Sequence, residues 1–290
     1  MKSQKSSTHE ASSCLYLVAT PIGNLEDMTM RALRILKEVD MIAAEDTRNT
    51  KHLCNYFAIE TKLVSYHEHN QESGGHKILS FLENGQSVAL VSDAGMPCIS
   101  DPGEDIVHKA LEEGYRVVPV PGANAALSAL IVSGISPQPF LFYGFLPRKK
   151  KERVTELEKL ARRQETLLFY EAPHRLKECL KGFNTVFGGD RRIVLGREIT
   201  KKFEEFLRGT LAEALEWAET NEMRGEFCLV VEGSSEEEQP EQQEWWQGLE
   251  IAEHVEQVMA QDDMRSKDAI KQVATDRKLP KREVYDAYHK

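Results

Sequence analysis

The sequence has no long hydrophobic run and few cysteines. None of its apolar segments approaches the roughly 20 residues that span a bilayer, and residues 1–13, which we expect to be disordered, contain no apolar stretch. We therefore expect a cytoplasmic protein without a membrane anchor or a secretory signal. The five cysteines are scattered and include no Cys-x-x-Cys spacing, so they predict neither a disulfide framework nor a structural zinc site.

The common nucleotide-binding signatures are missing as well. No Gly-x-Gly-x-x-Gly follows the first apolar run, and no Gly-x-x-x-x-Gly-Lys-Ser/Thr occurs anywhere. The sequence therefore predicts neither a dinucleotide site nor a nucleoside triphosphate site. Residues with metal-ligand spacing are not found either, and we expect no metal.

Charge is distributed unevenly along the chain. The net charge is −10, but residues 226–264 hold twelve acidic residues and no Lys or Arg, so the remainder sums to about +2. Residues 264–290 have a surplus of four positive charges, and a second basic cluster lies at 148–153. Such clusters permit a large polyanion as partner, although a charged run is also common on a solvated surface.

Short apolar runs alternate with helical patterns, which predicts an α/β protein whose first sheet is mainly parallel. A first domain at 14–135 and a second α/β domain at 136–233 are separated by the turn-forming residues 134–139. We expect strands at 15–19, 41–44, 62–65, 88–91 and 116–120 in the first domain, and at 140–145, 166–170, 193–197 and 227–232 in the second.

The last part of the sequence predicts an acidic linker at 234–248 and a helical tail at 249–290. Ser266 is expected to cap a helix that ends at about residue 277, and a further helix is expected at 282–289. Together these two helices predict a hairpin of the helix-turn-helix type.

The residues directly after the first five predicted strands are candidates for a ligand site, because ligands bind at the carboxyl ends of strands in an open parallel sheet. Three of these loops combine small residues with proline: T-P-I-G-N at 20–24, S-D-A-G-M-P-C-I-S-D-P-G at 92–103 and P-G-A-N-A at 121–125. Such loops let the backbone approach a ligand, and helix N-termini behind them offer N–H groups to a carboxylate. One Pro-Gly pair alone is usually an ordinary turn, but three such loops predict a niche for a flat, charged cofactor.

The other two loops of the first domain are polar. Residues 45–48 (E-D-T-R) fit either a substrate-orienting cluster or a surface ion pair with a helix cap. Residues 67–70 (H-E-H-N) could ligate a metal, but without a further Cys or His set nearby we favour hydrogen bonding to a polar substrate. Glu171 and His174, after a strand of the second domain, are candidates for the opposite side of the site, although a lone histidine is as often structural.

Seven longer motifs are spread over residues 15–233. They read L-Y-L-V-A-T-P-I-G-N-L at 15–25, A-E-D-T-R at 44–48, V-A-L-V-S-D-A-G-M-P-C-I-S-D-P-G at 88–103, V-P-V-P-G at 118–122, Y-E-A-P-H-R-L at 170–176, R-E-I-T-K at 197–201 and G-E-F-C-L-V-V-E-G at 225–233. Together they resemble the tetrapyrrole methylase superfamily and, within it, the RsmI branch of bacterial small-subunit rRNA ribose methyltransferases. The helical tail is similar to that of the branch, so the resemblance covers nearly the whole chain.

The resemblance implies a homodimer of chains with two α/β domains, S-adenosylmethionine in the cleft between the domains, and a small helical tail. It also implies 2′-O-methylation of a cytidine in the decoding centre of 16S rRNA. Carried over by position, the cofactor-binding residues are Pro21, Ala94, Gly95, Met96, Ile99, Ser100, Asn124, Ala125, Tyr170 and Glu171. The basic residues that could contact rRNA phosphates are Arg148, Lys149, Lys150, Lys151, Arg153, Lys267, Lys271, Lys281 and Arg282.

Methylation of a ribose hydroxyl benefits from a positioned base, because the hydroxyl is a poor nucleophile at neutral pH. Candidate residues for this role follow converging strand ends, and which of them takes the proton is open. They are Glu45, Asp46, His67, Glu68 and Asp93, with Arg48 orienting a carboxylate or phosphate.

The sequence departs from the family's pattern at four places, and two alternatives stay open. The departures are Ala19, Met96, Cys98 and the pair Ala123-Asn124. Cofactor contacts made by the backbone would tolerate them, whereas the usual threonine hydroxyl is missing at Met96. The alternatives are a methyltransferase acting on a tetrapyrrole or other small molecule, and an RNA-binding protein whose cofactor pocket has lapsed.

Overall fold

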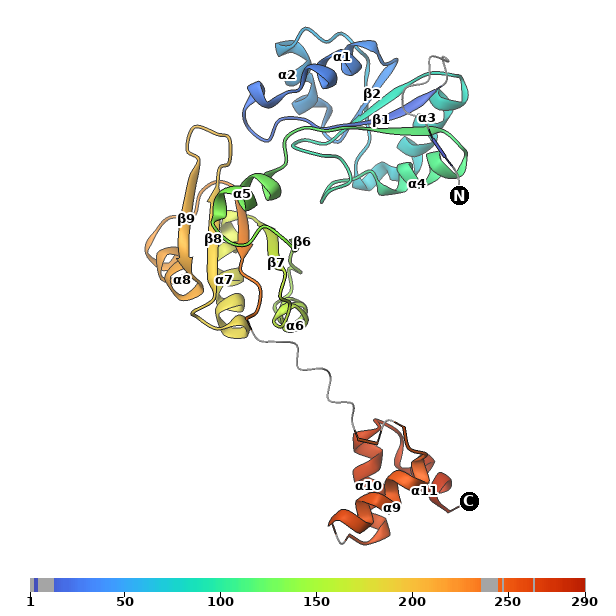
Figure 1. Ribbon diagram of the computed structural model, residues 1–290. Coiled ribbons are helices and arrows are strands. Elements are labelled where there is room, and N and C mark those ends of the chain that lie inside the picture. The colour runs from blue at the N-terminus through green and yellow to red at the C-terminus, as the bar shows by residue number, and fades with distance from the viewer. Residues whose placement is uncertain (1–2, 5–12, 236–244, 247, 263, 290) are drawn as a thin grey trace. The chain divides into compact units, whose positions relative to one another are not determined.

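The computed structural model describes residues 3–4, 13–235, 245–246, 248–262 and 264–289, which belong to two units, residues 1–235 and 236–290 (Figure 1). Most of the predicted disordered N-terminus and of the predicted acidic linker lies outside the described residues. Every helix within the described ranges is too short or too polar to cross a membrane.

The first sheet has five parallel strands in the order β3-β2-β4-β1-β5, which confirms the predicted parallel arrangement. The predicted bounds of β2, β4 and β5 are confirmed, and β1 and β3 each begin one residue from the predicted start. β2 and β4, inside the sheet, are buried on both faces, which is why they read as short uninterrupted apolar runs. Their bounds are β1 (Cys14–Val18), β2 (Met41–Ala44), β3 (Leu63–Ser65), β4 (Val88–Val91) and β5 (Arg116–Val120).

Helices cover both faces of this sheet (Figure 1). α1 and α2 pack on the face that presents Val18 and Val91, and α3 and α4 pack on the face that presents Leu15 and Leu90. The two faces alternate along each strand because successive side chains point to opposite sides. The bounds are α1 (Met30–Glu38), α2 (Thr47–Tyr56), α3 (Gln71–Glu83), α4 (Glu104–Glu112) and the 3-10 turns η1 (Leu25–Asp27) and η2 (Glu68–Asn70).

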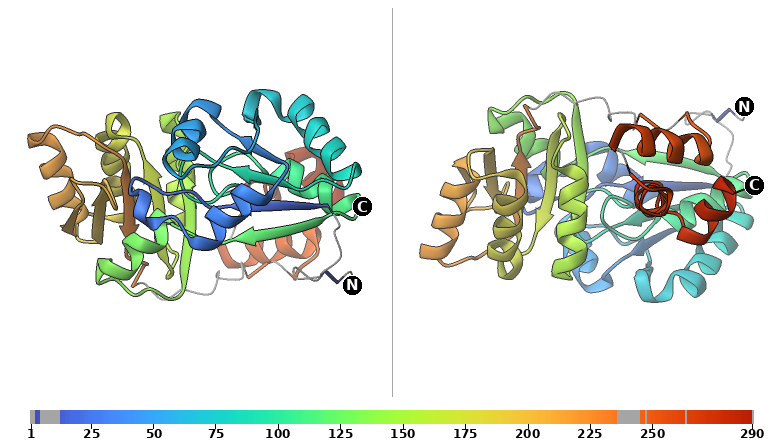
Figure 2. Two further views of the ribbon diagram at one scale, coloured as in Figure 1. Left: turned by 90° about the horizontal axis from the view of Figure 1, so that it is seen from above. Right: turned by 90° about the horizontal axis from the view of Figure 1, so that it is seen from below.

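The second sheet is mixed, with the order β6-β7-β10-β8-β9. β6 runs parallel to β7, and the other neighbours are antiparallel. Helices α6, α7 and α8 pack on the face that presents Phe169 and Leu229, and α6 and α7 lie side by side (Figure 2). The bounds are β6 (Phe140–Phe145), α6 (Lys150–Leu160), β7 (Thr166–Glu171), α7 (Pro173–Phe187), β8 (Arg192–Arg197), β9 (Glu205–Thr210), α8 (Leu211–Thr220) and β10 (Phe227–Val231).

The sequence did not predict β9 and α8. β9 is an edge strand with half-exposed side chains, so its sequence E-F-L-R-G-T has no apolar run. α8 begins with a capping box in which Thr210 and Glu213 each accept a hydrogen bond from the other's backbone N–H. The Thr-x-x-Glu spacing is a recognised start signal that could have revealed this helix.

α5 (Ala125–Ser133) follows β5 in sequence but packs on the second sheet. Its residues Ala129 and Leu130 belong to a core cluster with Leu168 and Val230. α5 is apolar on all sides, so the sequence gives no sign of which sheet it covers. The boundary predicted at 134–139 follows α5 in the chain. By its packing, however, α5 belongs with the second domain.

The C-terminal unit has a core of its own, formed by three helices instead of a two-helix hairpin. They are α9 (Ile251–Asp262), α10 (Ser266–Asp276) and α11 (Lys281–Tyr288). Val255, Ile270 and Val284 belong to the core between them. The prediction that Ser266 caps a helix is wrong: Ser266 is the first residue of α10, Arg265 is the N-cap, and no side chain caps this end.

Candidate active site

β1 and β4 are neighbours in the first sheet, but the chain leaves them in opposite directions. The connection from β1 crosses to β2 on the far side of β4, and the connection from β4 crosses to β5 on the far side of β1. Loops at such a switch point diverge and leave a crevice at the carboxyl ends of the strands. The topology therefore places a ligand site beside the loops that follow β1 and β4.

Backbone contacts hold three loops together at this point. The Thr20 N–H donates to the Gly95 carbonyl (2.8 Å) and the Gly95 N–H donates to the Thr20 carbonyl (3.1 Å). The Thr20 hydroxyl donates to the carbonyl of Ser92 (3.2 Å). Gly122, after β5, lies so close to Ala19 that a Cβ at position 122 would be 2.8 Å from the Ala19 Cβ. The three small-residue loops of the sequence thus meet at one place.

A cavity of about 380 Å³ opens at these loops. Its volume lies within the range of small-molecule and cofactor sites. Pro21 does not line it, and the neighbouring Ile22 does. The other nine residues assigned to the cofactor all line the cavity: Ala94, Gly95, Met96, Ile99, Ser100, Asn124, Ala125, Tyr170 and Glu171. Lining residues that were not individually assigned to the site from the sequence include Asp101, Phe145, Gly196, Ile199, Lys201 and Glu226.

The long loop after β4 has an unusual backbone conformation. Cys98 and Ser100 have positive φ angles of 70° and 64°, and this left-handed region costs a residue with a side chain roughly 1–2 kcal/mol. Gly103 leaves space for Cys98, because a Cβ at position 103 would lie 2.5 Å from the Cys98 Sγ. The conformation places Ile99, Ser100 and Asp101 on the cavity wall. Backbone strain of this kind gathers at functional sites.

Tyr170, on β7, contributes to the wall from the second sheet. Its hydroxyl accepts a hydrogen bond from the Ala126 N–H near the start of α5 (3.3 Å). Burial raises the pKa of Tyr170 to about 12, so the phenol is protonated at neutral pH. Edge contacts with Phe142 and Phe145, at centroid distances of 5.0 and 5.7 Å, fix the ring. Phe145 is 50% exposed and also lines the cavity, so it can offer an aromatic face to a ligand.

Glu171 is a buried carboxylate on the same wall, with 2% of its surface exposed. Its Oε1 accepts a hydrogen bond from the Ala172 N–H (2.9 Å) and pairs with Nε of Arg175 (3.3 Å). A buried carboxylate needs such partners because burial disfavours its charge. His174, considered beside Glu171 in the sequence, is exposed and does not line the cavity.

Lys201, in the loop after β8, connects the two α/β domains. Its ammonium group donates hydrogen bonds to Glu198 (3.0 Å) and Glu226 (2.8 Å). Its stem lies against Gly23, where any side chain would overlap the Lys201 Cγ. Lys201 and Glu226 both line the cavity.

The ionisable residues of the cavity wall favour a cationic ligand. Asp101, Glu171 and Glu226 are acids, and Lys201 is the one base among the described residues that line the cavity. A surplus of carboxylates at a partly buried site attracts positive charge. The small residues of the loop after β4 let such a group approach the backbone.

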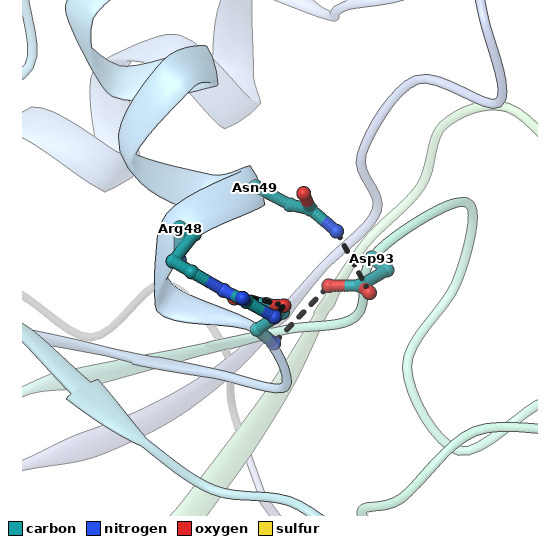
Figure 3. Close-up of polar contacts among 4 residues, drawn as sticks. Arg48, Asn49 and Asp93 are labelled. Atoms are coloured by element: carbon teal, nitrogen blue, oxygen red, sulfur yellow. Dashed lines mark hydrogen bonds and ion pairs between the residues drawn. The ribbon is translucent and has the colours of Figure 1, made fainter.

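Asp46 and Arg48 form an ion pair, and Asp46 also caps a helix. This was one of the two interpretations of residues 45–48, the other being a substrate-orienting cluster. Asp46 is the N-cap of α2 and accepts a hydrogen bond from the Arg48 N–H (2.8 Å), and the Arg48 guanidinium pairs with the same carboxylate (2.6 Å). These bonds lower the pKa of Asp46 to about 2. Figure 3 shows Asp93 bound to the same helix start: its Oδ1 accepts from the Asp46 N–H and its Oδ2 from the Asn49 side chain, each at 3.1 Å.

Glu45 lies beside Asp93, whose N–H donates a hydrogen bond to the Glu45 Oε2 (3.3 Å). Burial, the largest effect, and the negative charge of Asp93 raise the pKa of Glu45. The structure therefore brings Glu45, Asp46, Arg48 and Asp93 together. None of the four is among the residues that line the cavity.

His67 and Asn70 bind the local backbone. The His67 Nδ1 accepts a hydrogen bond from the His69 N–H (3.2 Å), and the Asn70 side chain accepts one from the His67 N–H (2.8 Å), which forms a capping box at η2. Glu68 is exposed, and neither His67 nor Glu68 lines the cavity. Across the described part of the chain, no group of three or more His, Cys, Asp and Glu residues could hold a metal ion.

Asp101 is an acid of the cavity wall that sequence reasoning did not single out. Burial, then the negative charge of Glu45 and that of Asp93, raise the pKa of Asp101 to about 7, while a hydrogen bond with Ser92 acts in the opposite direction. Asp101 thus borders both the cavity and the carboxylates of Glu45 and Asp93. Its place in the S-D-P-G segment after β4 was the available signal, but burial distinguishes it from Asp93, the other acid of that loop, which is exposed.

The predicted basic residues are exposed with one exception. Lys149, Lys150 and Lys151 lie at the start of α6 and are exposed, as are Arg148 before them and the four predicted residues of the tail. Arg153 is only 7% exposed, and its guanidinium donates a hydrogen bond to the carbonyl of Arg148 (3.2 Å). Its assignment to RNA binding is therefore corrected, because its guanidinium holds the segment before α6.

Comparisons with known proteins define the class to which this fold and cavity belong. A family model described as Tetrapyrrole (Corrin/Porphyrin) Methylases matches residues 14–215. A cobalamin biosynthetic cobalt precorrin-4 methyltransferase, CbiF, has a TM-score of 0.57 at 19% identity, covering 76% of this chain and 94% of its own. Uroporphyrin-III C-methyltransferase from Thermus thermophilus, solved with S-adenyl homocysteine, has a TM-score of 0.55 at 21% identity, covering 75% and 96%. Both structures have the same two-domain α/β fold as this chain.

Relatives of higher identity cover nearly the whole chain. Ribosomal RNA small subunit methyltransferase I from Bacillus subtilis (strain 168) is 62% identical over 95% of this chain and 94% of its own length. The protein of the same name from Halalkalibacterium halodurans is 55% identical over 100% and 99%, and that from Synechocystis sp. is 45% identical over 93% and 95%. The chain therefore belongs to the tetrapyrrole methylase family and, within it, to the ribosomal RNA small subunit methyltransferase I group, as its motifs indicated.

Proposed function

We propose that the protein transfers a methyl group from S-adenosylmethionine to the 2′-hydroxyl of a cytidine in the decoding centre of 16S rRNA. The observation that carries the proposal is a cofactor-sized cavity with an acidic wall, placed at the switch point of the first sheet and bordered by further carboxylates. Ribosomal RNA as substrate is supported by the names of the relatives. Such a substrate places the reaction in the cytoplasm.

The residues of the cavity fit the proposed donor. When bound, S-adenosylmethionine supplies a methyl group on a positively charged sulfur. The carboxylates of Asp101 and Glu171 suit that charge, and the rings of Phe145 and Tyr170 suit a flat heterocycle. Gly95 allows a close backbone approach.

One departure from the family's pattern has a structural role at this cavity. The Asn124 side chain accepts a hydrogen bond from the Leu127 N–H (2.9 Å) and caps α5. Asparagine is among the preferred N-cap residues. The departure therefore preserves the start of the helix whose first residue, Ala125, lines the cavity.

The protein's main contribution to an in-line methyl transfer is to align the reacting atoms and exclude water. Walls from both α/β domains can hold the donor in a fixed orientation. Arg48, whose side chain is 86% exposed beside the carboxylates, can orient a phosphate of the RNA. The exposed cations at 148–151 and in the tail can add phosphate contacts that carry no sequence information.

A homodimer is part of the proposal, and α5 offers a surface for it. The inner side of α5 packs on the second sheet. Its outer side exposes Leu127 (46%), Ile131 (77%) and Val132 (41%), and Phe140 of β6 is 42% exposed. Exposed apolar side chains grouped in this way mark contact surfaces. A second copy that uses the same face would satisfy two-fold symmetry.

The proposal is tested by supplying the protein and labelled S-adenosylmethionine with small ribosomal subunits, free 16S rRNA or a porphyrinogen. We expect label in 2′-O-methylcytidine after digestion of the rRNA to nucleosides. Label in the porphyrinogen alone would favour the small-molecule alternative. Absence of heat when S-adenosylmethionine is titrated in a calorimeter would favour a lapsed pocket.

A further inference from the structure

The loop between β8 and β9 carries a highly exposed aromatic side chain. Phe203 is 71% exposed, and among the described residues no other Phe, Tyr or Trp is more exposed. Its loop neighbours Lys202 and Glu204 are exposed as well. A single apolar side chain on a surface is ordinary by itself, so the meaning of Phe203 depends on where the loop lies and on how its backbone is held.

The loop lies at the edge of the cavity. Ile199 and Lys201 line the cavity, and Phe203 follows Lys201 by two residues, which span at most about 7 Å of chain. The stem of Lys201 lies against Gly23 of the first domain, where any Cβ would overlap the Lys201 Cγ. The loop therefore starts where both α/β domains border the cavity, and Phe203 is within reach of an RNA whose ribose enters it.

Two turns place Phe203 at the tip of this loop, which projects beyond the strands of the second sheet (Figure 1). The Lys201 N–H donates a hydrogen bond to the Glu198 carbonyl (2.9 Å), and the Glu204 N–H donates one to the Lys201 carbonyl (3.1 Å). Lys202 and Phe203 are the two central residues of the second turn. Both of their side chains are exposed there.

The backbone of the loop is held in a fixed and costly conformation. Glu198 and Thr200 have positive φ angles of 49° and 69°, a region that residues with a side chain rarely adopt. The Glu198 Oε1 accepts hydrogen bonds from the Glu226 N–H (2.9 Å) and the Lys201 ammonium (3.0 Å). The Glu204 Oε2 accepts one from the Thr200 N–H (2.6 Å). A loop held in this way loses little conformational entropy when its tip binds a partner.

The chemistry of the tip favours a nucleic-acid base over a protein surface. The residues beside Phe203 are charged and exposed, namely Lys202, Glu204 and Glu205, whereas a protein contact usually needs a contiguous apolar patch. The Lys202 ammonium lies over the Phe203 ring, 5.6 Å from its centroid. A base on this ring would therefore have a cation nearby for its phosphate. Unstacked RNA bases are commonly bound on aromatic side chains.

We propose that Phe203 stacks on a base adjacent to the nucleotide that is methylated. The contact rests on the proposed RNA methylation and names a residue that binds its substrate. Stacking tolerates any base, because every base has an aromatic face. Phe203 therefore fixes the position of the RNA strand at the mouth of the cavity and does not select the sequence.

The contact is tested with Phe203→Ala in the full chain, with small ribosomal subunits as substrate. We expect kcat/KM to fall roughly 5–150-fold, the range for the loss of one base–aromatic stack, mainly through KM. Phe203→Trp keeps an aromatic face and should retain the wild-type kcat/KM. Phe203→Leu is apolar but has no ring, and should behave like the alanine variant. The Kd for S-adenosylmethionine should be equal in all of them, because Phe203 does not line the cavity.

Tyr56→Ala is the matched control. Tyr56 is 67% exposed and is the last residue of α2, roughly 14 Å along the helix from its first residue. Its removal deletes an equally exposed aromatic ring and should leave kcat/KM at the wild-type value. Both Phe203 and Tyr56 are surface residues, so neither replacement should disturb the fold.

Three results overturn the contact. The first is a Phe203→Ala variant with the wild-type kcat/KM. The second is a Phe203→Leu variant that matches Phe203→Trp, since leucine has no ring to stack on a base. The third is a Phe203→Ala variant that sediments as a monomer while the wild type sediments as a dimer, because Phe203 would then belong to a contact between two copies.

Binding to small subunits, measured by co-sedimentation without S-adenosylmethionine, separates this contact from the proposed function. A wild-type protein that binds small subunits but methylates no ribose overturns the proposed function. In that case Phe203→Ala should still bind them more weakly than Tyr56→Ala, and equal binding by the two variants overturns the contact. A wild-type protein that binds no small subunits overturns both.

Discussion

The backbones of Thr20 and Gly95 exchange two hydrogen bonds, 2.8 and 3.1 Å long, across the switch point of the first sheet. The pair connects the loop after β1 to the loop after β4, which supplies Ala94, Gly95 and Met96 to the cavity. The geometry of the cavity therefore depends on a contact between two backbones, and this explains why small residues occur there.

Gly95→Ala should weaken binding of S-adenosylmethionine several-fold in a calorimetric titration. The φ angle of Gly95 is 77°, and this region costs a residue with a Cβ roughly 1–2 kcal/mol. Gly114→Ala is the matched control, because its φ is 84° and nothing lies within 4 Å of the added Cβ. Gly114→Ala should be destabilised by about as much as Gly95→Ala, but its Kd for S-adenosylmethionine should equal that of the wild type. Equal Kd values for wild type and Gly95→Ala would contradict the role of this contact.

Asn124→Ala should destabilise the protein and weaken cofactor binding, whereas Asn124→Ser should do neither. The alanine removes the cap of α5, which costs about 0.5–2 kcal/mol, and serine restores a capping oxygen. Urea unfolding gives the stability, and calorimetry gives the Kd. If serine behaves like alanine, the contribution of Asn124 is not its cap.

Asp101 should make the protein less stable as the pH rises. The carboxyl ionises near pH 4 in the unfolded chain and near pH 7 in the folded one, so its contribution is complete below pH 4 and is lost as the pH rises through about 7. Asp101→Asn cannot ionise, so its stability relative to the wild type should increase as the pH rises between those limits. Urea unfolding of both proteins from acid to mildly alkaline pH measures this, and a constant difference would contradict the raised pKa.

Replacing Lys149, Lys150 and Lys151 together by Ala should weaken binding to rRNA and reduce its dependence on salt. Each phosphate contact that is lost should lower the slope of log K against log salt by about 0.7–0.9. Replacing Lys267, Lys271, Lys281 and Arg282 tests the tail in the same way. Cofactor affinity should stay constant in both variants. An unchanged slope would show that the replaced cluster does not contact the RNA.

Ile131→Asp should convert a dimer into a monomer in analytical ultracentrifugation, because Ile131 is 77% exposed on the outer side of α5. Met30→Asp is the control, since Met30 is 83% exposed on α1 and lies outside the proposed contact. A dimer that persists in Ile131→Asp would remove α5 from the interface.

Much of the fold was predictable because inner strands of the first sheet are buried on both faces. β2 and β4 read as uninterrupted apolar runs for that reason, and their bounds were predicted correctly. β9 could not be found in the same way, since an edge strand with half-exposed side chains has no such run. The sheet on which α5 packs could not be predicted either, because a helix that is apolar all round has no distinct buried face.

The site was predictable at the level of loops and less so at the level of side chains. The sequence shows that Asp93 and Asp101 belong to the same loop. In the folded loop, Asp101 lines the cavity, whereas Asp93 binds the start of α2. The positive φ angles of Cys98 and Ser100 belong to this loop conformation. Such angles at residues other than glycine are set by the surrounding packing.

The most direct test of the central claim is a mass-spectrometric map of 16S rRNA from cells with and without the gene. If the cavity serves ribose methylation, one cytidine of the decoding centre should lose a 2′-O-methyl group in the deletion and regain it when the wild-type gene is returned. An unchanged methylation map in the deletion would contradict the account.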